Sequence, residues 1–209
     1  MQIVVLANAI LKEELSGNSG SPDEKIIWIS NVDEFKDHLQ AEILIDLLFK
    51  KEESRINLLQ QFLPGLIIIN SVEYTLSEIH PSFVRINAWN GFLRSALIEA
   101  SCTNNDQKQK VQNVFELFNK KIEWLPDEPG FVTPRIISMI INEACFALEE
   151  GVSSREEIDI AMKLGTHYPF GPFEWAEKIG WGDIVSLLKK LALVNSHYQP
   201  SSLLLKQPS

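Results

Sequence analysis

The side chains that most often carry out chemistry are few in this chain and scattered along it. None of the four histidines shares helical spacing with another histidine or with a cysteine, and the two cysteines form no Cys-x-x-Cys pair. The sequence also contains no Gly-x-Ser-x-Gly elbow, P-loop or Gly-x-Gly-x-x-Gly turn. These patterns exclude a disulfide framework and give no support to a metal site, a serine hydrolase or a P-loop nucleotide site. The residues concerned are His38, His80, His167, His197, Cys102 and Cys145.

A dinucleotide-binding fold holds its pyrophosphate on a glycine-rich turn between the first strand and the first helix. The apolar residues 3–6 predict such a strand, but residues 7–12 (Ala-Asn-Ala-Ile-Leu-Lys) contain no glycine. Gly17 and Gly20 lie too far along the chain, and the polar residues 12–25 predict a loop. The roughly 20 residues before the next strand leave no room for a full crossover helix, a strand with a ribose-binding acid and a further helix. We therefore expect an eroded cofactor-binding unit; a cofactor loop of unfamiliar form is the alternative.

The elements that would position a site alternate between strands and helices over the first half of the chain. Short apolar runs predict strands covered on both faces, and amphipathic stretches predict helices. Their alternation favours a mainly parallel α/β sheet. The expected strands are residues 3–6, 26–29, 43–49, 66–69, 84–89 and 96–100, and the expected helices are residues 32–39, 52–62 and 106–120.

From residue 130 onward the sequence predicts only helices. Ser153 and Ser154 each precede a glutamate by three residues, so either can cap the second helix, and Pro172 suits the first turn of the third. Asp183 is the expected cap of the fourth. The boundary falls near residues 127–130, which predicts domains of residues 1–128 and 129–209. The expected helices are residues 133–150, 154–164, 172–179 and 183–193.

Composition and charge restrict the class of protein. Hydrophobic residues make up 45% and charged residues 22% of the chain, which excludes disorder of the whole chain. The net charge of −9 and the lack of a basic run make nucleic acid a poor partner. The apolar runs are too short to span a bilayer, and the N-terminus lacks the basic start of a signal peptide. We therefore expect no membrane partner and a cytoplasmic location.

The helical half carries an ordered set of motifs that resembles the C-terminal domain of the 3-hydroxyacyl-CoA dehydrogenases. The most specific part is residues 161–174, and weaker similarity extends over roughly residues 26–205, including residues 41–50 and 83–99. The motifs are residues 129–135 (Pro-Gly-Phe-Val-Thr-Pro-Arg), 142–144 (Asn-Glu-Ala), 157–159 (Glu-Ile-Asp), 161–165 (Ala-Met-Lys-Leu-Gly), 168–170 (Tyr-Pro-Phe) and 171–174 (Gly-Pro-Phe-Glu).

The resemblance implies a fold and a reaction. The fold would be a reduced, Rossmann-like α/β N-terminal domain followed by an all-α C-terminal domain of the 6-phosphogluconate/3-hydroxyacyl-CoA dehydrogenase type. The reaction would be the oxidation of a 3-hydroxyacyl-CoA in fatty-acid metabolism, with NAD as the hydride acceptor. In the family a histidine takes the hydroxyl proton, a glutamate orients that histidine, and an asparagine at the start of the helical domain helps to hold the reacting groups.

Matched residue by residue, this chain departs from the family at most of these positions. Asn87 stands at the position of the histidine and Pro134 at that of the asparagine, whereas Glu99 remains at the position of the glutamate. On the nicotinamide side, Lys50 stands in place of a glutamate and Arg55 in place of a lysine. An amide does not titrate near neutral pH, and loss of a general base costs about 10²- to 10⁴-fold in rate. Without its histidine, Glu99 is expected to be a solvated carboxylate at a strand end.

These departures lead to two functional hypotheses. The first is a degenerate dehydrogenase with little or no activity and doubtful NAD binding. The alternative is a non-catalytic protein that binds an acyl-CoA or serves as a scaffold. In both cases the family's dimers and the wide apolar arc on residues 134–150 predict a homodimer through the helical domain. The alternative is that the first domain covers this arc within one chain. The arc comprises Ile136, Ile137, Ile140, Ile141, Ala144, Cys145, Ala147 and Leu148.

Overall fold

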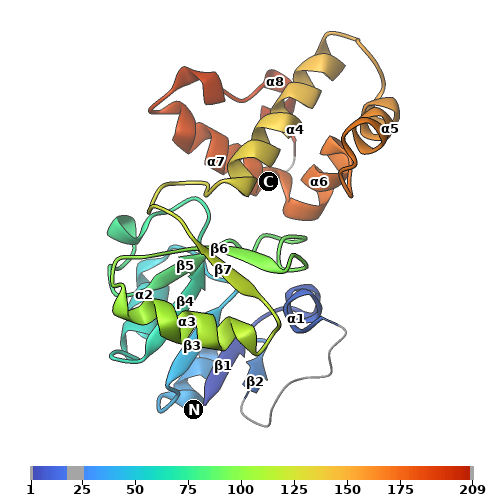
Figure 1. Cartoon of the computed structure of the whole chain (residues 1–209). Helices are drawn as coiled ribbons and strands as arrows, with labels where there is room; N and C mark the ends of the chain where they lie inside the picture. The colour runs from blue at the N-terminus through green and yellow to red at the C-terminus, as the bar shows by residue number, and fades with distance from the viewer. Residues whose placement is uncertain (1, 18–25, 208–209) are drawn as a thin grey trace. The chain divides into compact units, whose positions relative to one another are not determined.

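Two units make up the fold, Met1–Phe131 and Val132–Ser209. The computed structural model describes residues 2–17 and 26–207. Within those residues the first unit holds a seven-stranded sheet with helices, and the second holds helices alone (Figure 1). The expected combination of a Rossmann-like α/β domain and an all-α domain is confirmed.

The sheet has the strand order β2-β1-β3-β4-β5-β6-β7. Neighbouring strands are parallel except β5 and β6, which are antiparallel, so β6 and β7 run against the other five. The six strands expected from apolar runs are present, but β7 was missed because only one of its four side chains is buried. The strands are β1 (Ile3–Leu6), β2 (Ile26–Ile29), β3 (Ile43–Asp46), β4 (Leu66–Asn70), β5 (Val84–Ile86), β6 (Leu97–Cys102) and β7 (Lys121–Trp124).

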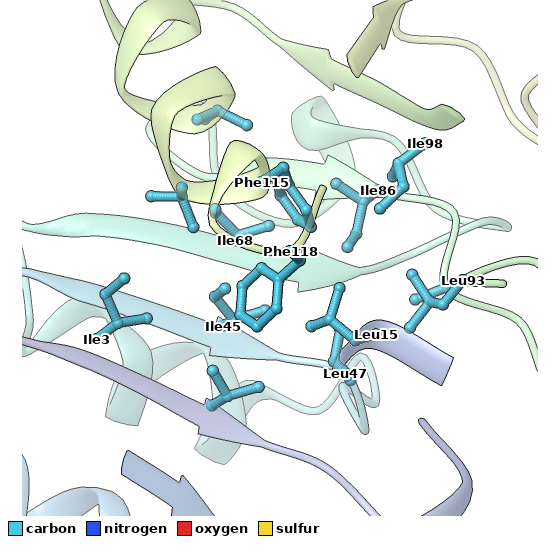
Figure 2. Packing of buried hydrophobic residues seen from close by; sticks show 14 of the residues in the cluster. Ile3, Leu15, Ile45, Leu47, Ile68, Ile86, Leu93, Ile98, Phe115 and Phe118 are labelled. Carbon is cyan, nitrogen blue, oxygen red and sulfur yellow. The ribbon is translucent and has the colours of Figure 1, made fainter. Parts of the chain in front are cut away.

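Each face of the sheet is covered by helices, which explains the continuous apolar runs. Helices α1 (Ala9–Ser16) and α3 (Asp106–Glu116) pack on one face, where Leu15 and Phe115 meet the strand residue Ile45. Figure 2 shows this layer, in which Phe118 and Leu93 also point into the cluster. The 3₁₀ helix η1 (Val32–His38), α2 (Glu53–Gln60) and the short η2 (Leu76–Glu78) supply the side chains of the other layer.

The expectation of a loop after the first strand is wrong at residues 12–16, where the structure has α1; residues 18–25 lie outside the described residues. The sequence of this helix looks too polar for a crossover helix because Glu14 lies on the same face as Leu11 and Leu15. All three are buried, and both oxygens of the Glu14 carboxylate accept hydrogen bonds from the Gly91 backbone N–H, at 3.0 and 2.8 Å. A buried carboxylate with such partners is compatible with a core-facing helix.

The strand–helix–strand unit that was expected to be eroded is therefore present in a short form. Strands β1 and β2 are parallel and are linked through α1, which has only eight residues. The part of the Rossmann-like fold that is reduced follows β2. A doubly wound fold places a third strand outside the second, whereas β2 is the outermost described strand here and η1 leads directly from β2 to β3.

The second unit is built around the long helix α4 (Thr133–Glu149). Helices α6 (Pro172–Ile179), α7 (Trp181–Ala192) and α8 (Ser202–Leu205) pack against α4, and α5 (Arg155–Thr166) packs against α6. Of the two possible caps of α5, Ser154 is the N-cap, in a capping box with Glu157. The expected cap at Asp183 is wrong, because the N-cap of α7 is Gly180, three residues earlier, and Asp183 lies in the first turn.

The most specific family motif forms the junction between α5 and α6. The Asp159 carboxylate accepts a hydrogen bond from the backbone N–H of Phe173 at 2.8 Å, in the first turn of α6. Glu174 reaches back to the backbone N–H of Gly171 at 2.9 Å and pairs with Lys163 of α5 at 2.5 Å. A Cβ on Gly171 would overlap Cβ and Cγ of Asp159. The spacing of residues 159–174 is therefore an architectural requirement.

Replacing Gly171 with alanine should destabilise the second unit by about 1–3 kcal/mol, because the added methyl group displaces Asp159. The matched control is Gly165→Ala in α5, where a Cβ has no neighbour within 4 Å. That change should leave stability unchanged or raise it by up to about 1 kcal/mol, since alanine favours the helix. Urea unfolding of both variants measures the difference. Equal stability of the two variants would show that Asp159 yields without cost.

Candidate functional site

The carboxyl ends of β1, β3, β4 and β5 point the same way, so the loops that follow these strands meet at one edge of the sheet. This is the edge at which open α/β folds bind ligands. Asn70, the last residue of β4, joins two of these loops. Its amide Nδ2 donates to the Leu47 carbonyl oxygen at 3.2 Å and to the Ala88 carbonyl oxygen at 3.4 Å, while its Oδ1 accepts from the Ala88 N–H at 3.0 Å. The loops after β3 and β5 are therefore held at a fixed spacing.

Asn87 and Glu99, matched to the family's histidine and glutamate, lie side by side on this edge. Asn87 directly follows β5, Glu99 lies within β6, and the Asn87 Nδ2 donates to Glu99 Oε2 at 3.1 Å. Both side chains are buried. The expectation that Glu99 would be a solvated strand-end carboxylate is wrong, because the antiparallel pairing of β5 with β6 places it next to Asn87.

The geometry of a base and its orienting carboxylate is thus present with an amide in place of the base. Asn87 Oδ1 accepts from the Trp89 backbone N–H at 3.3 Å, so the carboxamide is held at both ends. An amide in this orientation can donate a hydrogen bond but cannot accept a proton near neutral pH. His38 and His80, which precede β3 and β5 in the chain, belong to the opposite edge of the sheet. Neither histidine of the first unit therefore stands beside the pair to remove a proton.

Arg55 is engaged in a buried ion pair rather than left open to a cofactor. Its Nε lies 2.8 Å from Asp46 Oδ2 and its Nη2 lies 3.0 Å from Asp46 Oδ1, at the end of β3. Burial raises the pKa of the Asp46 carboxyl, and the guanidinium and the Leu48 N–H oppose that rise. Lys50, the other residue matched to the nicotinamide side, is exposed in the loop between β3 and α2. The structure does not bring the side chains of Arg55 and Lys50 together in one binding site.

The turn between β1 and α1 does not have the form that holds a dinucleotide. Ala7 and Asn8 connect the two elements, and the Asn8 side chain caps the helix by accepting from the Leu11 N–H at 2.9 Å. A pyrophosphate site needs glycines for close backbone approach and free N–H groups at that terminus. After β2, where a ribose-binding acid would stand, Ser30 and Asn31 are folded into the capping box of η1. These residues do not fit NAD.

Pro134, matched to the family's asparagine, is buried in the first turn of α4 in the second unit. Proline has no side-chain donor or acceptor and suits the first turn of a helix. The asparagine of the adjacent motif, Asn142, has a structural role: its Oδ1 accepts from the Ser201 N–H at 2.8 Å and its Nδ2 donates to the Gln199 carbonyl oxygen at 3.0 Å. Asn142 thus fastens the C-terminal segment to α4.

The sequence analysis missed several polar side chains that shape this edge of the sheet. Glu14 holds the loop after β5 through Gly91 and pairs with Arg94, whose Nε lies 3.2 Å from the Glu14 Oε1. Its sequence signal was a glutamate on the apolar face of a short helix. Asp46 was also detectable, as the acidic residue within an apolar run. Within residues 2–17 and 26–207, no cluster of His, Cys, Asp and Glu could hold a metal ion, and no helix is long and apolar enough to cross a membrane.

Comparison with known proteins matches residues 130–207 to the family described as 3-hydroxyacyl-CoA dehydrogenase, C-terminal domain. The chain is 39% identical over 110 residues to a 3-hydroxyadipyl-CoA dehydrogenase of Escherichia coli, covering 51% of this chain and 23% of that protein. It is 34% identical over 143 residues to a 3-hydroxybutyryl-CoA dehydrogenase of Clostridioides difficile, covering 64% of this chain and 48% of that protein. The matches thus span from under a quarter to about half of these relatives.

Solved structures support the fold of the whole chain. The (S)-3-hydroxybutyryl-CoA dehydrogenase of Ralstonia eutropha aligns with a TM-score of 0.72 and 24% identity, covering 87% of this chain and 69% of that one. FadB2 of M. tuberculosis aligns with a TM-score of 0.79 and 14% identity, covering 98% of this chain and 92% of that one. At these identities the likeness concerns the fold alone.

Replacing Arg55 with methionine should destabilise the first unit by about 3–5 kcal/mol, because it leaves the buried Asp46 carboxylate without its partner. Lys50→Met is the matched control, and removal of this exposed cation should change stability by no more than about 0.5 kcal/mol. Chemical unfolding of the two variants gives both values. A destabilisation below about 1 kcal/mol for Arg55→Met would mean that the ion pair contributes no more than a surface pair.

Proposed function

We propose, from the premise that the chain belongs through residues 130–207 to the 3-hydroxyacyl-CoA dehydrogenase family, that it is a member with little or no dehydrogenase activity. It keeps the family's fold as a binding or scaffold protein. The family's reaction needs a base at the hydroxyl group and a bound NAD. The residues that would have to meet these two requirements lie in the first unit, outside the segment matched to the family.

The observation that carries this proposal is the hydrogen bond from Asn87 to Glu99. The amide occupies the place of the base. Its N–H donates a hydrogen bond to the carboxylate that would otherwise orient an imidazole. A carboxamide does not take up a proton near neutral pH in any orientation, and here its oxygen also accepts a hydrogen bond from the Trp89 N–H. Loss of the base alone lowers the rate by about 10²- to 10⁴-fold.

The turn between β1 and α1 supports the same proposal from the cofactor side. Asn8 caps the helix terminus on which a pyrophosphate would lie, and no glycine permits close approach. The cation matched at Arg55 is held by Asp46. A ligand without a dinucleotide part is compatible with these features. An acyl-CoA is the natural candidate, since the relatives of the helical unit are named as dehydrogenases of CoA thioesters.

NADH should show no saturable binding at micromolar concentrations, because the helix terminus is already capped and the turn lacks glycine. Energy transfer from the five tryptophans to bound NADH measures this directly in an equilibrium titration. Acetoacetyl-CoA is the second ligand, and calorimetry measures its binding. Its binding would support the acyl-CoA-binding function, and its failure to bind would leave the scaffold function.

Asn8→Gly is the informative variant in the NADH titration, because it removes both the cap and a side chain from the turn. It should still bind weakly, since Ala7 remains and the residue directly after β2 is Ser30 and not an acid. Micromolar NADH affinity of the unmodified chain would refute the proposal on the cofactor side. Weak binding that becomes tight in Asn8→Gly would instead identify the cap as the sole obstacle.

We further propose that the second unit forms a homodimer. Part of the apolar arc on α4 is buried within the chain, at Ile137, Ile141, Ala144 and Cys145, but Ile136 is 50% exposed. On α5, Ile160 and Leu164 stand one turn apart and are 52% and 75% exposed. An isolated domain gains by burying such side chains against a second copy, and two-fold symmetry is the commonest arrangement.

Light scattering at micromolar concentration should give twice the chain mass of 23.7 kDa. Leu164→Glu places a charge on the proposed interface and should return the protein to a monomer. Leu193→Glu is the matched control, since Leu193 is 87% exposed just beyond the end of α7 and should leave the dimer intact. A mass of 23.7 kDa at all concentrations would contradict the dimer.

A further inference from the structure

The segment of residues 127–131 has the composition of a flexible linker, yet in the structure it is bound to the first unit. Its partner is Arg85, the central residue of β5, whose side chain is fully buried. A guanidinium can be buried only if its donors are paired, and its planar fork can hold several acceptors at once.

Two of the guanidinium nitrogens hold the connecting segment itself. The Arg85 Nε donates to Asp127 Oδ1 at 2.6 Å, and the Nη2 donates to the Glu128 carbonyl oxygen at 2.5 Å. The guanidinium carbon also lies 4.1 Å from the centroid of the Phe131 ring, within the range of a cation–π contact. One side chain thus contacts the first, second and last residues of this five-residue segment.

The same side chain connects the segment to the loop after β4. The Nη1 of Arg85 donates to the Ser71 carbonyl oxygen at 3.1 Å. Two further bonds run parallel to this link: the Leu76 N–H donates to Asp127 Oδ2 at 2.9 Å, and the Gly130 N–H donates to the Val72 carbonyl oxygen at 2.7 Å. Because they share these partners, the connecting segment and the loop after β4 form one hydrogen-bonded body.

The backbone at the end of the segment is also held in an unfavourable conformation. Phe131 has φ of 46°, in the left-handed region that residues other than glycine seldom adopt, and its ring is buried. Such a conformation persists where the surroundings over-determine it. Here the surroundings are the Arg85 guanidinium under the ring and the Gly130 N–H bond on the preceding residue.

We propose that Arg85 is a strap that fastens residues 127–131 to the sheet, so that the Pro-Gly stretch belongs to the folded body of the first unit and does not act as a flexible linker. The strap also ties this segment to the loop at the carboxyl end of β4. A ligand that displaces that loop must then disturb the segment leading into the helical unit.

Residue-resolved hydrogen exchange of the full chain tests the strap. In the unmodified protein, the Leu76 and Gly130 amides should be protected. In Arg85→Lys, which keeps the charge but cannot reach three acceptors, both amides should exchange at least about tenfold faster, because exchange follows the population of the opened segment. Amides of β3 should keep their protection, which separates local release from global unfolding.

Asp127→Asn is the second variant, and it keeps an oxygen for the Leu76 N–H while removing the ion pair. It should release Gly130 more than Leu76. Arg94→Lys is the matched control, since Arg94 also pairs with a carboxylate of the first unit but makes no recorded bond to residues 127–131. Chymotrypsin should cleave after Phe131 in the Arg85 and Asp127 variants sooner than in the control.

Three results would overturn the proposal. The first is rapid exchange of the Leu76 and Gly130 amides in the unmodified protein. The second is unchanged exchange at Gly130 in both variants. The third is equal acceleration in Arg94→Lys, which would attribute the effect to general loosening. If Arg85→Lys fails to fold, the unmodified protein and Asp127→Asn still decide the question.

Discussion

A polar group taken out of water needs a hydrogen-bond partner, and this requirement organises the carboxyl edge of the sheet. Glu14 is satisfied by the Gly91 N–H, Asp46 by Arg55, and Asn70 by backbone groups of Leu47 and Ala88. Asn87 and Glu99 satisfy each other. Groups that would meet a substrate and a cofactor in a dehydrogenase are thus committed to internal bonds. The same internal bonds that hold this edge together support the proposal that its side chains do not transfer protons.

The two units use their family residues differently. In the second unit, Asp159, Gly171 and Glu174 form a helix junction, and Asn142 fastens the C-terminal segment. These are requirements of packing, and they apply whether or not the protein is an enzyme. In the first unit, Asn87 and Lys50 stand where the resemblance implies reacting or cofactor-binding groups. An intact architectural motif beside substituted chemical positions is compatible with the proposal that this chain keeps the fold without the reaction.

Much of the fold could be predicted from local patterns. Apolar runs of four to seven residues identified β1 to β4, and capping signals located α5 and α6. The failures share a physical cause, since α1 was hidden by the buried Glu14 and β7 by its exposed charged side chains. Local composition cannot reveal a partner that lies 77 residues away, as Gly91 does from Glu14.

The candidate site was likewise predictable only in part from local sequence. The spacing of residues 87–99 was enough to match Asn87 and Glu99, but their contact depends on the antiparallel pairing of β5 with β6. Arg55 was matched to a lysine on the nicotinamide side, and only the fold reveals Asp46 beside it. Arg85 carried no signal, because an arginine in a short apolar strand is not expected to be buried.

The most direct measurement of the central claim is a single-turnover reduction of acetoacetyl-CoA, with the protein in molar excess over NADH. This design removes product release as an explanation for inactivity. The account predicts that the absorbance of NADH decays no faster with the protein than without it. A decay whose rate rises with protein concentration, and which disappears in Glu99→Gln, would contradict the account.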